Sequence, residues 1–146
     1  MQCTTADYES LWIEIRNSNG HNIICGVIYR HPNDNLVSFL EYLNTTAECI
    51  DQRGKYCVVL GNFKVDLLKI EKHQPTDNFL NTISSFCFQP QISQPTRIAD
   101  HSATLIHNIF FNSLEHFTIS GNVIYDISDH FPNFHLYQTM STYIKK

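Results

Sequence analysis

The sequence predicts a mixed α/β fold, because helical and extended patterns alternate along it. Two stretches repeat apolar residues at helical spacing, a short wholly apolar run separates them, and further extended segments stand at both ends of the chain. The chain has 146 residues, and the 42% that are hydrophobic suffice for one core. We therefore expect a single domain that spans residues 1–146.

The first extended segments are rich in β-forming residues and predict a hairpin. They cover residues 10–15 and 22–29, and Asn19 and Gly20 between them favour a tight reversal with positive φ. A helix is predicted next and ends near Gly54, since one apolar stripe recurs at spacings of three and four: Leu36, Phe39, Leu40, Leu43, Ala47 and Ile50.

The second half of the chain continues the alternation. Residues 56–60 form an apolar run that stops at Gly61, as a strand buried on both faces does. A second helix is predicted with Thr76 as its N-cap and Asp77 in its first turn. Three extended segments are predicted after the prolines at 90 and 95: residues 105–111, 117–125 and 131–137.

Charge, cysteines and the first residues exclude several classes of protein. The net charge is -4, so the whole chain exerts no bulk attraction on nucleic acid or anionic lipid. The start lacks the pattern of a signal peptide, and the longest uncharged apolar run, residues 23–29, is too short to span a bilayer. We expect a soluble intracellular protein. Five cysteines without a C-x-x-C pair favour reduced packing thiols over a zinc ribbon or a disulfide scaffold.

Polar residues collect where the predicted strands end, which is where α/β sheets place ligand sites. The four stretches are residues 29–32 (YRHP), 61–66 (GNFKVD), 102–110 (SATLIHNIF) and 128–132 (SDHFP). In this order and at these intervals they resemble the endonuclease/exonuclease/phosphatase superfamily. Within it, the chain is most similar to the apurinic-type endonuclease domain of non-long-terminal-repeat retrotransposon polyproteins, over about residues 9–136.

The resemblance implies a two-sheet α/β/β/α sandwich, of which the chain holds roughly the C-terminal two-thirds. It implies Mg²⁺-dependent hydrolysis of DNA phosphodiesters. That chemistry needs hard oxygen ligands for Mg²⁺, a base that activates water, and donors for the developing charge. It also implies DNA and a downstream reverse transcriptase as partners.

Three residues match the functional positions of this family. Tyr29 falls on its phosphate-contacting tyrosine, and Asp129 and His130 fall on its terminal acidic metal ligand and its histidine. The resemblance therefore makes Tyr29, Asp129 and His130 the catalytic candidates. Asp129 is the single candidate ligand for Mg²⁺.

Three other positions depart from the family pattern. Asn62 and Lys64 stand where the family has Asp and Asn, and His107 replaces the carboxylate that orients the histidine. An amide neither accepts a proton nor brings negative charge to Mg²⁺. His107 lacks the acceptor that would hold a protonated His130. We expect hydrolysis to be impaired and Mg²⁺ binding to be doubtful.

Several alternatives remain at this stage. The Lys64 ammonium either neutralises Asp129 or extends into water, and His107, His130 and Asp129 together could hold a transition metal. The chain could instead be a non-catalytic module that binds nucleic acid or protein, with Arg30 and Lys64 as phosphate contacts.

Arg97 completes the phosphate contacts of that alternative. A further alternative is an active nuclease completed by the N-terminal part of the domain, encoded separately. If leading strands normally pair with the hairpin of residues 10–29, this chain exposes a strand edge and part of a core face.

Overall fold

The computed structural model of the protein describes residues 2–4, 8–16, 22–32, 35–114 and 118–137. Two α-helices, a 3₁₀ turn and ten strands lie in this part of the chain. They are β1 (Gln2–Thr4), β2 (Tyr8–Ile15), β3 (Ile23–Arg30), α1 (Leu36–Asp51), β4 (Tyr56–Asn62), η1 (Leu67–Lys69), α2 (Gln74–Ser84), β5 (Gln89–Pro90), β6 (Arg97–Ala99), β7 (Ser102–Thr104), β8 (His107–Phe111), β9 (Thr118–Asn122) and β10 (Asn133–Tyr137).

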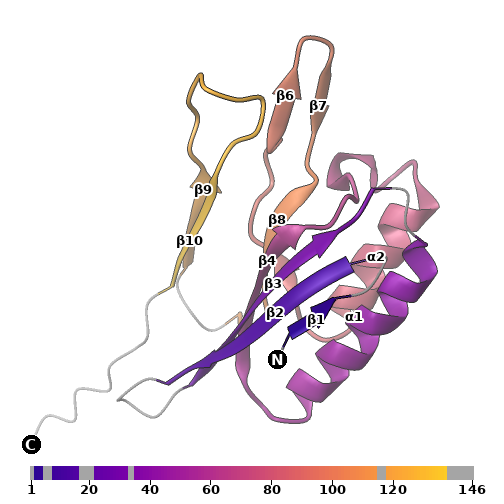
Figure 1. Cartoon of the computed structure of the whole chain (residues 1–146), viewed down its shortest axis with the longest axis vertical. Helices are drawn as coiled ribbons and strands as arrows, with labels where there is room; N and C mark the ends of the chain where they lie inside the picture. The colour runs from indigo at the N-terminus through magenta and orange to yellow at the C-terminus, as the bar shows by residue number, and fades with distance from the viewer. Residues whose placement is uncertain (1, 5–7, 17–21, 33–34, 115–117, 138–146) are drawn as a thin grey trace, which may run out of the picture.

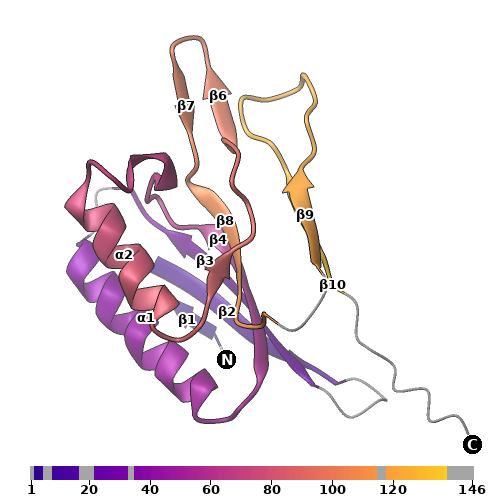
Figure 2. The ribbon, with the colours of Figure 1, turned by 180° about the vertical axis from the view of Figure 1, so that it is seen from behind.

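The main sheet has six strands in the order β1-β2-β3-β4-β8-β5. Neighbours are antiparallel except β3 and β4, which are parallel because α1 carries the chain from one to the other. Two-stranded pairs form from β6 with β7 and from β9 with β10. The helices cover one face of the sheet and the β9–β10 pair lies on the other (Figures 1 and 2). The predicted α/β fold is confirmed, with the second sheet represented by a two-stranded pair.

The hairpin and the first helix form as predicted. The strands β2 and β3 pair antiparallel along their whole length, while the predicted turn at Asn19 and Gly20 falls outside the described residues. The helix α1 begins after Asn35, whose side chain accepts a hydrogen bond from the backbone N–H of Val37. It ends before Gly54, which adopts a φ of 59°.

The prediction of Thr76 as the N-cap of α2 is wrong. The N-cap is His73, so the helix begins at Gln74, three residues earlier than predicted. Pro75 causes the difference, since its fixed φ suits the first turn of a helix. Thr76 is buried instead, with its hydroxyl 3.0 Å from Nδ1 of His73 and 3.4 Å from the backbone oxygen of Asp66.

The core between the helices and the sheet is built on phenylalanine rings. Phe63 meets Phe110 edge to face at 5.2 Å between ring centroids, and Phe79 packs against both. Trp12 belongs to the same core, and its indole lies over Gly26 on the neighbouring strand. A Cβ on Gly26 would come within 2.3 Å of that ring, so only glycine fits beneath it.

The opposite face of the sheet is covered over part of its area. Below the β9–β10 pair, Phe111 packs against His135 and Tyr137. Beyond it, Leu11, Val27 and Ile13 expose 49%, 50% and 51% of their surface. An apolar row that continues the covered core is therefore exposed on this face of the described sheet.

Neither α-helix of the described residues is long and apolar enough to cross a membrane. Cys25, Cys49, Cys57 and Cys87 form no disulfide, and Cys57 is buried as a packing thiol. Cys49 and Cys87 are exposed, which corrects the prediction of core thiols at these two positions. Cys49 belongs to α1 but lies off the apolar stripe that faces the sheet, and Cys87 lies in the loop between α2 and β5 with a φ of 63°.

Candidate functional site

Three of the residues singled out by the sequence lie in one row across the sheet. Tyr29 of β3 is directly opposite Asn62 of β4, and Asn62 is directly opposite His107 of β8. Residues directly opposite in a ladder face the same side of a sheet. Tyr29, Asn62 and His107 therefore share the face that carries the β9–β10 pair.

The chain turns sharply after β4 and brings Lys64 to this row. Gly61, next to the last residue of β4, has no room for a side chain because a Cβ there would lie 2.1 Å from the backbone oxygen of Ile28. The side-chain oxygen of Asn62 accepts a hydrogen bond from the backbone N–H of Lys64 at 3.3 Å. Lys64 has a left-handed φ of 51°, and its ammonium lies 5.9 Å from the centre of the Tyr29 ring.

A buried guanidinium supports the turn from below. Arg30 is 8% exposed and donates to the backbone oxygens of Phe63 and Lys64, both at 3.4 Å, while its charge lies over the Phe39 ring. The prediction that Arg30 contacts phosphate is therefore wrong. It ends a strand next to the candidate site, but its side chain points into the core, where the sheet alternation places it.

His107 is half-buried and held by Thr96. The Thr96 hydroxyl oxygen accepts the backbone N–H of His107 at 3.2 Å and lies 3.1 Å from its Nδ1. The rings of His107 and His130 meet edge to face, with 4.9 Å between centroids. Burial, followed by the neighbouring charges of His130 and Lys64, lowers the pKa of His107 to about 4. His107 is therefore neutral at physiological pH.

Asp129 is beside the row but already has a cationic partner. Its carboxylate accepts a hydrogen bond from Arg97 Nε at 2.8 Å, and a backbone bridge between Arg97 and His130 holds the two segments together. The other carboxylate oxygen is 3.8 Å from Nε2 of His130. The structure thus pairs Asp129 with Arg97, so of the two alternatives for Lys64 the one in which it neutralises Asp129 is not formed.

The cluster comprises Tyr29, Asn62, Lys64, His107 and His130, and each of these side chains carries an N–H or O–H that can donate a hydrogen bond. Within it Lys64 brings a positive charge and Asn62 an amide nitrogen that makes no hydrogen bond to another described residue. None of these five residues is a carboxylate, and the nearest one, Asp129, is paired with Arg97. An arrangement of donors around a cation suits a bound anion.

These residues do not fit a Mg²⁺ ion. Magnesium is held mainly by carboxylates with several waters, and no described group of three or more His, Cys, Asp or Glu side chains lies close enough to hold a metal. The same finding leaves the pair of His107 and His130 with Asp129 without support as a transition-metal site. The anionic ligand that a divalent cation requires is used in the ion pair with Arg97.

One residue of the same turn has a structural role that the sequence did not reveal. The Asp66 carboxylate accepts the backbone N–H of Leu105 at 2.9 Å and that of Leu68 at 3.3 Å. It thereby ties the turn after β4 to the segment that leads into β8. The signal in the sequence for this role is an acidic residue directly before a short turn, in a stretch without proline or glycine, because such a side chain often accepts backbone N–H groups.

An acidic cavity borders the cluster. It measures about 810 Å³, lies between the β6–β7 hairpin and residues 124–131, and includes Asp129 in its wall. Asp100 and Asp126 also line it. A polyanion is repelled on this side, so an anionic ligand of the cluster must approach from the side of Tyr29 and Lys64.

Comparison with solved structures decides the fold. The endonuclease domain of TRAS1, a telomere-specific non-LTR retrotransposon, superposes with a TM-score of 0.73 at 15% identity, over 97% of this chain and 69% of that one. The chain has the endonuclease/exonuclease/phosphatase fold. A family member from Bacteroides thetaiotaomicron matches at a TM-score of 0.63 and 16% identity, over 91% of this chain and 56% of its own. The APE2 catalytic domain from Xenopus laevis matches at a TM-score of 0.62 and 20% identity, over 90% of this chain and 55% of its own.

The chain thus spans 69% of the first of these structures and little more than half of the other two. No family model matches the sequence, and no curated protein matches it. At these identities the likeness concerns the fold, and the function must be argued from the residues of this chain.

Proposed function

We propose that this chain is a nuclease-fold domain of the retrotransposon endonuclease type that binds the phosphodiester backbone of DNA without hydrolysing it. One observation carries the proposal. At the end of the sheet, Asn62, Lys64 and His107 present an amide, an ammonium and a neutral imidazole where hydrolysis needs two carboxylates and an amide. These groups bind a phosphate but do not activate water.

In this proposal each residue of the cluster has a defined role. Lys64 supplies the positive charge, and its main chain is fixed by Asn62 and Arg30. The Asn62 amide and the Tyr29 hydroxyl donate hydrogen bonds to the phosphate oxygens. Tyr29 can reach a ligand in solvent, since 40% of its surface is exposed.

Hydrolysis fails for two reasons that concern protons. No group of the cluster has a free carboxylate to take a proton from water, because Asp129 is paired with Arg97. His107 is neutral with a pKa of about 4, so it does not stabilise a protonated His130 as a carboxylate would. Removing one member of such a unit commonly lowers the rate by several orders of magnitude.

Binding is tested with a fluorescein-labelled duplex of 20 base pairs by anisotropy at several salt concentrations. Lys64→Gln should weaken binding and reduce the slope of log K against log salt by about 0.9, the value for one phosphate contact. Lys72→Gln is the matched control, because Lys72 is an exposed lysine beyond the cluster. Equal affinities and slopes for the two variants would contradict the proposed site.

Hydrolysis is tested on supercoiled plasmid and on a duplex with one abasic site, both with Mg²⁺. We expect no nicking above that of the His130→Ala variant. Nicking by the unaltered protein that His130→Ala abolishes would show an active nuclease and refute this part of the proposal. The anisotropy assay contains no Mg²⁺, so it tests the binding part of the proposal independently of the nicking assay.

A further inference from the structure

The acidic cavity beside the cluster is bounded by two segments of the chain. One wall is the β6–β7 hairpin, whose turn is formed by Asp100 and His101, and the other is the loop of residues 123–132 between β9 and β10. Figures 1 and 2 show the two segments side by side at the same end of the sheet in opposite views. All residues that line the cavity lie in this described part of the chain.

Backbone hydrogen bonds join the two walls at their base. The N–H of Ile98 donates to the oxygen of Asp129, and the N–H of Phe131 donates to the oxygen of Thr96, both at 2.9 Å. The loop itself is closed by the N–H of Val123, which donates to the oxygen of Pro132 at 2.8 Å. The main chain around the cavity is therefore fixed in the free protein, which lowers the entropy cost of binding.

The lining of the cavity is largely apolar although it faces solvent. Ile98 and Ile124 expose 48% and 80% of their surface, and Tyr125 and Phe131 add two aromatic rings. Single exposed apolar residues are common on protein surfaces, but four that line one cavity are typical of an interaction site. The volume of about 810 Å³ lies within the range of ligand pockets and holds several side chains.

Charge on both walls indicates the chemistry of the occupant. Asp100 on the hairpin and Asp126 on the loop form no ion pair or side-chain hydrogen bond with another described residue, whereas Asp129 is paired with Arg97. The unpaired charge of the cavity is therefore negative. An arginine side chain matches it, because its methylene stem packs on apolar surface and its planar head pairs with a carboxylate and stacks on the Tyr125 ring.

We propose that the acidic cavity binds a short arginine-containing peptide segment of another protein. The arginines of the segment pair with Asp100 and Asp126, and an apolar side chain between them packs on Ile98 and Ile124. The carboxylates of the walls repel the phosphates of a nucleic acid. This proposal uses other residues than the phosphate-binding cluster, so it does not rest on the proposed function.

The test titrates the ¹⁵N-labelled protein with the acetylated and amidated peptide Ser-Arg-Leu-Arg-Ser at low salt. We expect saturable NMR shifts of the backbone N–H groups of residues 98–101 and 124–131, with those of α1 unchanged. Asp100→Asn and Asp126→Asn should each weaken binding roughly two- to fivefold, the range for one exposed ion pair. Together they should weaken it roughly four- to twenty-five-fold if the two pairs act independently.

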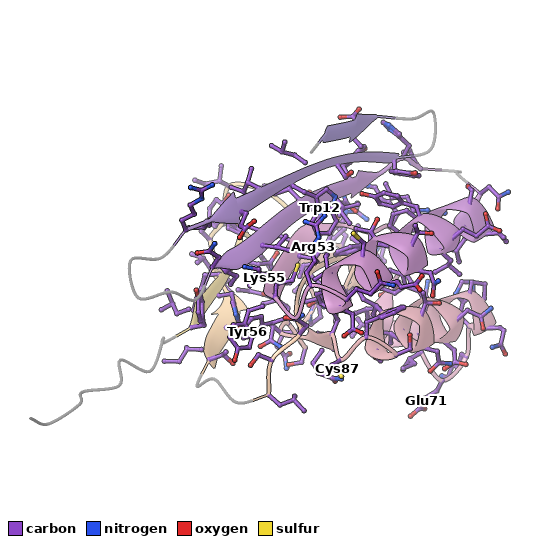
Figure 3. All side chains as sticks on the ribbon, turned by 90° about the horizontal axis from the view of Figure 1, so that it is seen from below. Trp12, Arg53, Lys55, Tyr56, Glu71 and Cys87 are labelled. Atoms are coloured by element: carbon purple, nitrogen blue, oxygen red, sulfur yellow. The ribbon has the colours of Figure 1, made fainter. Side chains whose placement is uncertain are left out.

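A matched control removes one negative charge elsewhere. Glu71 is exposed and lies on the side of α2, away from the β9–β10 pair (Figure 3). Glu71→Gln should therefore bind the peptide as the unaltered protein does. If Glu71→Gln weakens binding as much as Asp126→Asn, the attraction is due to net charge and the proposal is wrong.

Two altered peptides test the ligand without changing the protein. Citrulline in place of both arginines keeps their shape but removes the charge, and should weaken binding as much as the double Asn variant. Serine in place of leucine should weaken binding roughly threefold or more, because the apolar lining loses its partner. Equal binding of either peptide would overturn the proposal.

The remaining outcomes identify a different occupant or none. Absence of shifts at residues 98–101 and 124–131 at millimolar peptide would overturn the proposal. A single-stranded oligonucleotide that shifts these N–H groups at lower concentration than the peptide would make nucleic acid the occupant and overturn it. Shifts of the same groups that grow with protein concentration, without peptide, would make a second copy the occupant and overturn it as well.

Discussion

The neutral His107 should make stability depend on pH within a defined window. Its pKa is about 4 in the folded protein, against 6.5 for an ordinary histidine. Between these values the unfolded chain binds a proton at residue 107 and the folded protein does not, so protonation favours unfolding. The free energy of unfolding should therefore fall as the pH drops from 6.5 toward 4, and this contribution vanishes above pH 7.

The size of the effect follows from the two pKa values. From 6.5 to about 4, at 1.36 kcal/mol for each pKa unit, the contribution of His107 reaches at most about 3 kcal/mol. The ring is half-buried, so solvent screens part of its charge, and we expect a measured difference of ~1–2 kcal/mol.

Urea unfolding followed by Trp12 fluorescence between pH 4.5 and 7.5 measures this window. The variant His107→Asn keeps a polar partner for Thr96. Its free energy of unfolding should fall less steeply between pH 6.5 and 4.5 than that of the unaltered protein. His101→Asn, at an exposed histidine of the β6–β7 turn, should leave the pH dependence as it is. Parallel curves for His107→Asn and the unaltered protein, or an NMR titration of His107 near pH 6.5, would refute the reasoning.

Three other substitutions test how the sheet and the turn are built. Gly26→Ala places a Cβ against the Trp12 ring and should lower the free energy of unfolding by about 1–3 kcal/mol, and an unchanged urea midpoint would contradict the packing described. Asp66→Ala leaves two backbone donors without their acceptor and should cost ~1–3 kcal/mol, whereas Asp51→Ala, at an exposed position, should change little. Lys64→Gly relieves a left-handed φ and should raise stability by about 0.5–1 kcal/mol while weakening DNA binding, and parallel losses of both would argue against a binding role.

Periodicity identified the elements that bury a continuous apolar stripe. The helix α1 and the strand β4 begin where the sequence predicts them, at Leu36 and Tyr56, because α1 packs its apolar stripe against the sheet and β4 lies inside the sheet with both faces covered. The hairpin β6–β7 was not predicted. Its residues are exposed or half-buried, so no alternation of apolar side chains marks it in the sequence.

The candidate site could be located from the sequence, but the partners of its charged side chains could not. The strand ends gave Tyr29, Asn62 and His107, which the sheet register brings into one row. Partners that come from distant loops leave no local signal. The pairing of Asp129 with Arg97 joins residues 32 positions apart, and the burial of Arg30 depends on which face of β3 meets the helices.

The buried guanidinium of Arg30 has a kinetic consequence for any ligand of the cluster. It holds the carbonyls of residues 63 and 64 in the free protein, so the main chain that carries Lys64 is already in its binding conformation. A preorganised loop loses little entropy when a ligand arrives, and no closing step limits association. The association rate for an anion should then be set by diffusion and long-range attraction, and added salt should slow arrival more than it hastens departure.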